Sequence, residues 1–157
     1  DESLGADSEF DQLLFNSLTA KTWGRHNMLL FLRYNATIEG EAPLYGVFTG
    51  GGFLNMSGFE PNELVGENFG VAGAGYRYQV IQSGFLPGYV GGTVEYGNAS
   101  AERKDVFSDG ILNGSVYFGY ETPLGPLYLG WGWNTESRGL IFLSLGATFG
   151  SENLISR

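Results

Sequence analysis

Large apolar side chains alternate with small or polar ones over several long runs of this sequence, and this alternation limits the chain to few folds. The clearest run is Leu127 to Trp133, in which Leu or Trp occupies every second position and Tyr or Gly the positions between. A period of two is the pattern of a β-strand with two unlike faces. Apolar residues rarely recur at helical spacing, so the sequence predicts an all-β fold.

Seven such runs follow one another along the chain, with approximate bounds at residues 11–23, 28–38, 72–80, 89–98, 115–121, 127–133 and 141–149. Turn-forming residues separate the last three runs, so we expect consecutive strands to pair as an antiparallel meander. Most runs have roughly ten residues, the length that a tilted strand needs to cross a bilayer.

Two kinds of barrel fit these strands, because periodicity does not say which face meets water. Polar residues lie opposite the apolar stripe, among them Arg33, Arg77, Gln79, Glu95, Glu121 and Asn134. In a soluble β-barrel that binds a hydrophobic ligand the stripe would line the interior, whereas in a transmembrane β-barrel it would face lipid. We favour the membrane barrel because aromatic residues collect near strand ends, the opposite face is rich in Gly, and short and long turns alternate.

Composition supports the same choice. Only 16% of the residues are charged, against about 25% in an ordinary soluble domain. The formal net charge of −9 would repel phosphate backbones, so nucleic acid is not an expected partner. Residues 1–10 are acidic and polar and lack the features of a signal peptide, which indicates a mature chain or part of a longer one.

The segment 39–68 is too long for a tight turn between strands. Loops of about thirty residues inside a compact domain are usually functional. This one carries Phe53, Leu54, Met56 and Phe59, which would be out of place in water. We therefore predict that the loop folds inward onto protein.

Several segments resemble the carboxy-terminal half of the bacterial surface antigen barrel, namely GGFLNMSGFEPNELVG, GVAGAGYRYQV, GGTVEYGNAS and GSVYFGYETPLGPLYLGWGWN. The version behind patatin-like phospholipase domains is the most similar. The resemblance covers residues 11–149, and TPLGPL is its most specific piece. It implies a β-barrel segment in the bacterial outer membrane that serves as a membrane anchor and as a protein translocation or tethering domain.

In that family the tip of a long loop enters the barrel lumen and touches a motif on the inner wall. The resemblance implies such a contact between the tip residues Met56, Ser57, Gly58 and Phe59 and the wall residues Glu95 and Gly97. Ser57 stands where many members have Arg, and Thr93 replaces an aromatic residue of the wall motif. We expect Glu95 to accept hydrogen bonds from Ser57 or nearby backbone, and Arg33 and Arg77 to line the lumen.

The resemblance also implies partners. A sheet of seven strands has two open edges that lipid cannot satisfy, so we expect either a missing amino-terminal half of the barrel or a second copy of the chain to close it. The lipid bilayer is a further expected partner. The last strand resembles the signal read by the barrel assembly machinery, with Leu145, Gly146 and Phe149 as its recognition residues. Residues 150–157 form a polar tail.

No catalytic role is predicted. The nucleophile elbow of patatin, G-x-S-x-G, is absent from the sequence. A barrel-embedded hydrolase would need a His beside a Ser, for which His26 and Ser17 are the best pair. The carboxylates Glu102, Asp105 and Asp109 lack the spacing of metal ligands. We therefore expect no metal and no cofactor.

Overall fold

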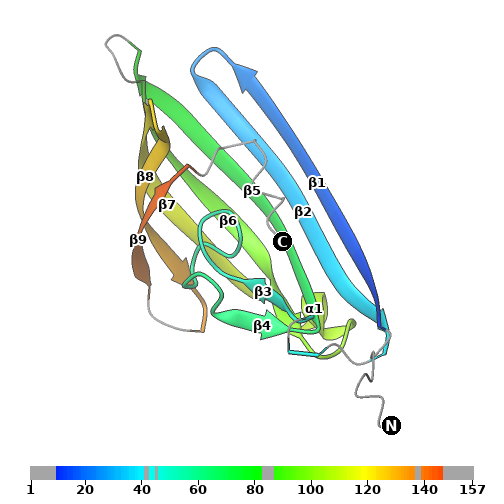
Figure 1. The fold of residues 1–157 in the computed structure, drawn as a ribbon. Coiled ribbons are helices and arrows are strands. Elements are labelled where there is room, and N and C mark those ends of the chain that lie inside the picture. Colours follow the sequence, from blue (N-terminus) through cyan, green and yellow to red (C-terminus); the bar gives the residue numbers. More distant parts are fainter. Residues whose placement is uncertain (1–9, 41–42, 45, 83–86, 137–138, 147–157) are drawn as a thin grey trace, which may run out of the picture.

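The computed structural model describes residues 10–40, 43–44, 46–82, 87–136 and 139–146. Its main body is one antiparallel sheet of seven strands in the order β1-β2-β5-β6-β7-β8-β9 (Figure 1). The bounds are β1 (Asp11–Trp23), β2 (His26–Glu39), β5 (Asn68–Ile81), β6 (Gly88–Ser100), β7 (Ile111–Thr122), β8 (Gly125–Asn134) and β9 (Leu140–Leu145). The all-β antiparallel meander predicted from the alternation is confirmed.

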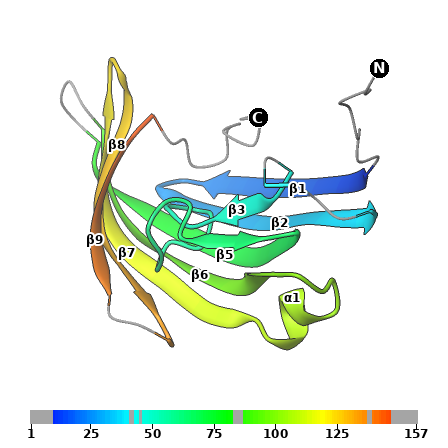
Figure 2. The same ribbon diagram turned by 60° about the horizontal axis from the view of Figure 1, so that its bottom comes forward.

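The sheet is bent but not closed. In the described part of the chain, β1 pairs only with β2, and β9 pairs only with β8. Figure 2 shows the sheet as an arc with the segment around β3 (Phe48–Gly50) and β4 (Leu64–Gly66) inside it. Within the described ranges, β1 and β9 are therefore the two edge strands of the sheet.

The strands extend beyond the predicted runs at several ends, because backbone pairing continues past the point where side chains alternate. β5 begins at Asn68 rather than at residue 72, and β7 begins at Ile111 rather than at 115. The last strand differs in the other direction. It was expected to reach residue 149 but ends at Leu145. Gly146 follows with a φ of +84°, a backbone conformation outside the β-strand region that Gly adopts readily. Phe149 lies outside the described residues.

The two faces of the sheet differ in chemistry. On the face turned away from the β3–β4 segment, the register brings large apolar residues into rows across the strands, such as Met28 beside Tyr76 and Val116 beside Trp131. We call this the outer face. Its exposed apolar side chains include Leu13, Phe15, Leu30, Leu32, Tyr76, Val94, Val116, Leu129, Trp131, Ile141 and Leu143. The face toward the β3–β4 segment, the inner face, carries both polar and apolar side chains, and the long loop covers part of it.

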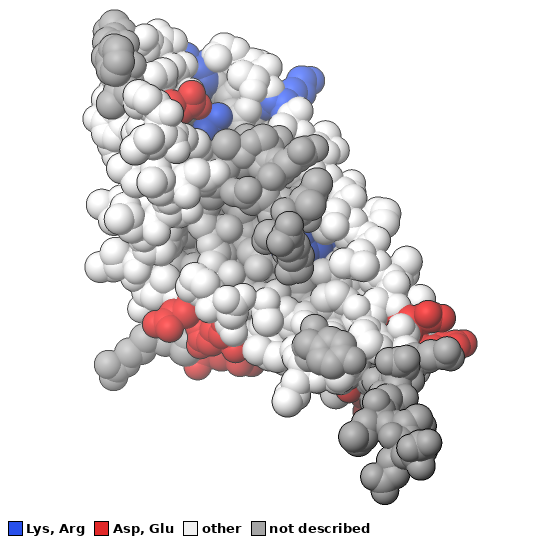
Figure 3. Space-filling view, in the orientation of Figure 1, with Lys and Arg blue, Asp and Glu red and all other residues white. Residues whose placement is uncertain are grey.

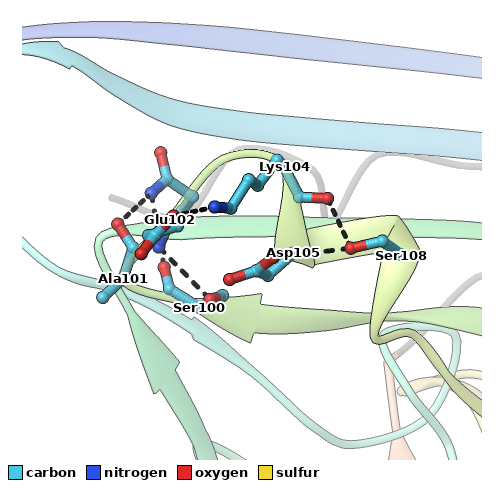
Figure 4. A network of polar contacts seen from close by, with 7 residues as sticks. Ser100, Ala101, Glu102, Lys104, Asp105 and Ser108 are labelled. Atoms are coloured by element: carbon cyan, nitrogen blue, oxygen red, sulfur yellow. Dashed lines mark hydrogen bonds and ion pairs between the residues drawn. The ribbon is translucent and has the colours of Figure 1, made fainter.

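Two small elements were not predicted. β3 and β4 pair as a short hairpin at the base of the long loop. The β6–β7 connection holds a four-residue helix, α1 (Asp105–Ser108), with Val106 fully buried. Local polar contacts surround it, including a 2.8 Å ion pair between Lys104 and Glu102 and a 2.8 Å hydrogen bond from Ser108 Oγ to the Lys104 carbonyl (Figure 4). None of the described helical residues form a segment long and apolar enough to span a membrane.

Candidate functional site: a loop seated on the inner face

The long loop reaches the inner face because a hairpin supports it. Phe48 pairs with Gly66 and Gly50 with Leu64, and the chain between them forms a compact tip. Within the tip, the Gly51 amide donates to the Asn55 carbonyl at 2.7 Å. Leu54 and Met56 adopt φ values of +60° and +77°. These values are unfavourable for residues other than Gly, so tertiary contacts must offset their free-energy cost. The tip conformation therefore depends on its seat against the sheet.

Ser57 and Glu95 form the centre of that seat. The Ser57 amide donates to Glu95 Oε2 at 2.5 Å, and Ser57 Oγ donates to Glu95 Oε1 at 2.9 Å. Both residues are only 1% exposed. Beside them, Thr93 Oγ1 and Ser115 Oγ lie 2.8 Å apart. A carboxyl group this deeply buried is tolerated only when donors face it, and the loop tip supplies two.

Gly58 places the loop backbone directly against β7 and β8. Its amide donates to Asn113 Oδ1 at 3.2 Å, and Asn134 Nδ2 donates to its carbonyl at 2.7 Å. A Cβ on Gly58 would lie 2.1 Å from the Trp133 carbonyl oxygen, and a Cβ on Gly132 would lie 2.0 Å from the Ser57 carbonyl oxygen. Both contacts are far too short for a side chain, so this approach requires Gly on both sides.

Sequence reasoning missed Asn113 and Gly132 as parts of the site and placed Asn134 only on the polar face of its strand. Their signal was present as Asn and Gly at alternate positions of two neighbouring strands. Such positions offer amide groups and free space on one face of the sheet. The sequence pattern does not show that the loop tip fills this space. Only the three-dimensional structure shows that.

Met56 and Phe59 flank the polar contacts with an apolar seal. Met56 is 0% and Phe59 4% exposed, and both belong to one cluster with Phe69, Val71 and Ile111 on the sheet. Asn113 Nδ2 also lies 3.2 Å from Met56 Sδ. Water is thereby kept away from the Ser57–Glu95 contact, which strengthens those hydrogen bonds.

Phe53 anchors a second part of the tip among aromatic rings. Its ring centroid lies 5.0 Å from that of Tyr117, 4.9 Å from Tyr128 and 5.3 Å from Phe142. In its predicted run, Phe142 is the one large apolar residue on a face that is otherwise small or polar. It packs there against the ring of Phe53. The loop therefore contacts the last strand as well as the centre of the sheet.

The two arginines expected to line the lumen both lie on the inner face, with different partners. Arg33 donates to Asn55 Oδ1 in the loop at 2.7 Å. Arg77 donates to the Tyr128 hydroxyl at 3.0 Å, and its guanidinium lies 4.2 Å from the centre of the Tyr89 ring. The structure thus brings Arg33 to the loop and places Arg77 within the wall.

The other expected site residues are spread along the sheet. Gly97 lies on β6 between Val71 and Ile111, where a Cβ would meet the Gly70 carbonyl oxygen at 1.9 Å. It serves close strand packing beside the loop seat. Leu145 is 58% exposed, and the Gly146 amide donates to the Pro126 carbonyl at 2.9 Å.

The pair considered for a hydrolase, Ser17 and His26, lies away from this loop. Ser17 pairs with Leu32, whereas His26 pairs with Trp23, six residues further along β1 and roughly 20 Å away. His26 Nδ1 instead lies 2.7 Å from the Tyr76 hydroxyl. The structure therefore does not bring together the pair considered for a hydrolase. Among the residues whose positions are described, no three His, Asp or Glu cluster as metal ligands would.

No protein-family model, no curated protein and no solved structure matches this chain.

Proposed function

We propose that this chain is one wall of a bacterial outer-membrane β-barrel, in which it acts as a membrane anchor and its long loop occupies the lumen. The remaining wall would come from further strands of a longer protein or from a second copy of the chain. The translocation or tethering role and the recognition of the last strand by the barrel assembly machinery are parts of this proposal and rest on the family resemblance.

The observation that carries the proposal is the chemistry of the outer face. On β2 and β5–β9, none of the outward-facing residues in the described strands is Asp, Glu, Lys or Arg. Their side chains are instead exposed apolar groups, such as Val94 at 54%, Val116 at 57% and Leu143 at 71%. An apolar surface of this extent is unusual for a monomer in water and is normal for a barrel wall in lipid.

The inner face supports the same proposal. A water-filled or plugged lumen tolerates polar and charged side chains, and this face carries Arg33, Arg77, Glu95 and Asn113. The loop tip covers Glu95 and Asn113 directly. These contacts are what we would expect if a loop, rather than lipid, occupied the interior of a barrel.

The soluble barrel with an apolar cavity is less well supported. Its ligand would need the apolar stripe on the concave side of the sheet. In Figure 2 the sheet bends around the loop, so the stripe lies on the convex side. A cavity lined by the stripe would require the opposite curvature.

Purification with and without detergent tests the proposal. We expect the chain to be β-rich by circular dichroism and monodisperse only in detergent, because the outer face needs an apolar solvent. The protein mass in the particle then distinguishes one chain from two. A monodisperse, β-rich monomer in plain buffer would overturn the proposal and favour the soluble ligand-binding barrel.

A further inference from the structure

The outer face changes character near the short β1–β2 turn. Trp23, His26 and Tyr78 lie side by side on β1, β2 and β5, with ring centroids 5.9 Å apart for Trp23–His26 and 5.0 Å apart for His26–Tyr78. Trp23 is 45% exposed. A row of Trp, Tyr and His with apolar bodies and polar tips suits the level of lipid headgroups.

Two cations border this aromatic row. Lys21 is exposed on β1, two residues before Trp23. Arg25 stands in the turn, with its guanidinium 5.1 Å from the centre of the Tyr78 ring and Nη2 donating to the Val80 carbonyl at 3.3 Å. No ion pair is found for either residue among the described residues. Their charges are therefore available to an external anion.

The ion pair at this end of the sheet adds little net charge to the outer face. Arg77 and Glu121 lie 3.8 Å apart on the inner face, so they partly neutralise each other away from the outer surface. Figure 3 shows most visible Lys and Arg atoms toward this end of the molecule and most Asp and Glu atoms toward the opposite end. On the face seen in Figure 3, basic and acidic atoms thus gather toward opposite ends.

We infer that Lys21, Trp23, Arg25, His26 and Tyr78, here called the short-turn patch, bind the phosphate headgroup of an anionic phospholipid. This inference rests on the proposed function, because it needs the outer face to lie in a membrane. The two cations would face the phosphate while the rings rest among the glycerol and acyl carbons. It places the short-turn end in the leaflet that presents anionic phospholipid.

The net charge of the chain makes this inference testable. At −9, the protein as a whole is repelled by an anionic surface. A preference for anionic vesicles would therefore have to come from a local patch. Each cation close to such a surface contributes about fivefold in affinity at moderate ionic strength.

The experiment is flotation of the chain with vesicles of phosphatidylcholine alone or of phosphatidylcholine mixed with phosphatidylglycerol. We expect the mixed vesicles to bind the chain at least tenfold more tightly. The double variant Lys21→Gln, Arg25→Gln should lose this preference. The matched control Arg103→Gln, Lys104→Gln removes the same charge at the opposite end and should keep it. The single variant Lys21→Gln leaves the Arg25 contacts intact and should lose about fivefold.

The outcomes separate this inference from the proposed function. Equal binding to both vesicle types, or an equal loss in the control variant, would overturn the headgroup inference and leave the membrane wall standing. A chain that floats with neither vesicle type contradicts the proposed function itself. Circular dichroism of each variant confirms that the sheet is retained before binding is compared.

Discussion

Ser57 and Glu95 are separated by 38 positions in the sequence and joined by two hydrogen bonds across the inner face. The loop contributes a backbone amide and a hydroxyl, and the wall contributes both oxygens of one buried carboxyl group. The donors are neutral, so the loop is held by oriented dipoles and close packing. Its stability should therefore depend on the shape of the contact as much as on charge.

Replacing Glu95 should release the loop tip. In Glu95→Ala the Ser57 amide and hydroxyl lose their acceptor while remaining near an apolar seal, which destabilises the seated loop by about 1–3 kcal/mol. Glu95→Gln keeps one acceptor oxygen and should have a smaller effect. Amide hydrogen exchange across residues 51–63 measures the effect of both variants. We expect exchange to be fastest in Glu95→Ala, slower in Glu95→Gln and slowest in the unmodified protein.

The control for that experiment is Glu60→Ala, which removes an exposed carboxylate from the same loop. Exchange in this variant should stay near that of the unmodified protein. If Glu95→Ala exchanged no faster than Glu60→Ala, the carboxyl group would not be holding the loop.

Gly58→Ala should displace the loop for steric reasons. The added methyl group would overlap the Trp133 carbonyl oxygen, and backbone of a paired strand cannot move aside cheaply. Gly52→Ala is the matched comparison, because its Cβ has no neighbour closer than 3.7 Å but its φ is +96°. Gly52→Ala should therefore show only backbone strain, of about 1–3 kcal/mol. Protease cleavage within the loop should be clearly faster in Gly58→Ala, and equal rates would refute the steric account.

Phe53→Ala should loosen the last strand. Removing the ring takes away the stacked partner of Phe142 on β9 and leaves space among Tyr117 and Tyr128. Aromatic pairs add about 0.5–1.5 kcal/mol each beyond area burial. We expect faster amide exchange in residues 140–145 as well as in the loop. Phe118→Ala, which removes a 37% exposed ring from the outer face, should leave exchange in 140–145 unchanged.

Val116→Arg tests the environment of the outer face. Val116 is 57% exposed in the middle of the apolar band, so water would accept an arginine there without penalty. In a bilayer the same change should weaken insertion by about 2–4 kcal/mol. Leu124→Arg, at an 83% exposed turn position, is the control and should insert normally. Vesicle flotation compares the two, and equal insertion would argue against lipid contact at Val116.

Sequence reasoning reached part of the candidate site. The family resemblance paired Ser57 with Glu95, and the structure joins them. It did not identify Asn113, Gly132 or the aromatic rings around Phe53 as parts of the site. Small and polar residues on a strand face can contact water, another strand or a covering loop. The difference depends on which loop residue lies opposite, and the alternation within one strand carries no information about that.

What the sequence by itself determined was the seven long strands, their antiparallel order and the chemistry of their two faces. These follow from side-chain alternation and turn residues, which are properties of neighbours along the chain. Only the tertiary structure decided that Asn113 and Gly132 receive the loop tip, that the last strand ends at Leu145, and that Phe53 packs on Phe142. Those features arise from contacts between distant segments, where close packing and hydrogen-bond geometry select one arrangement among several that the local pattern allows.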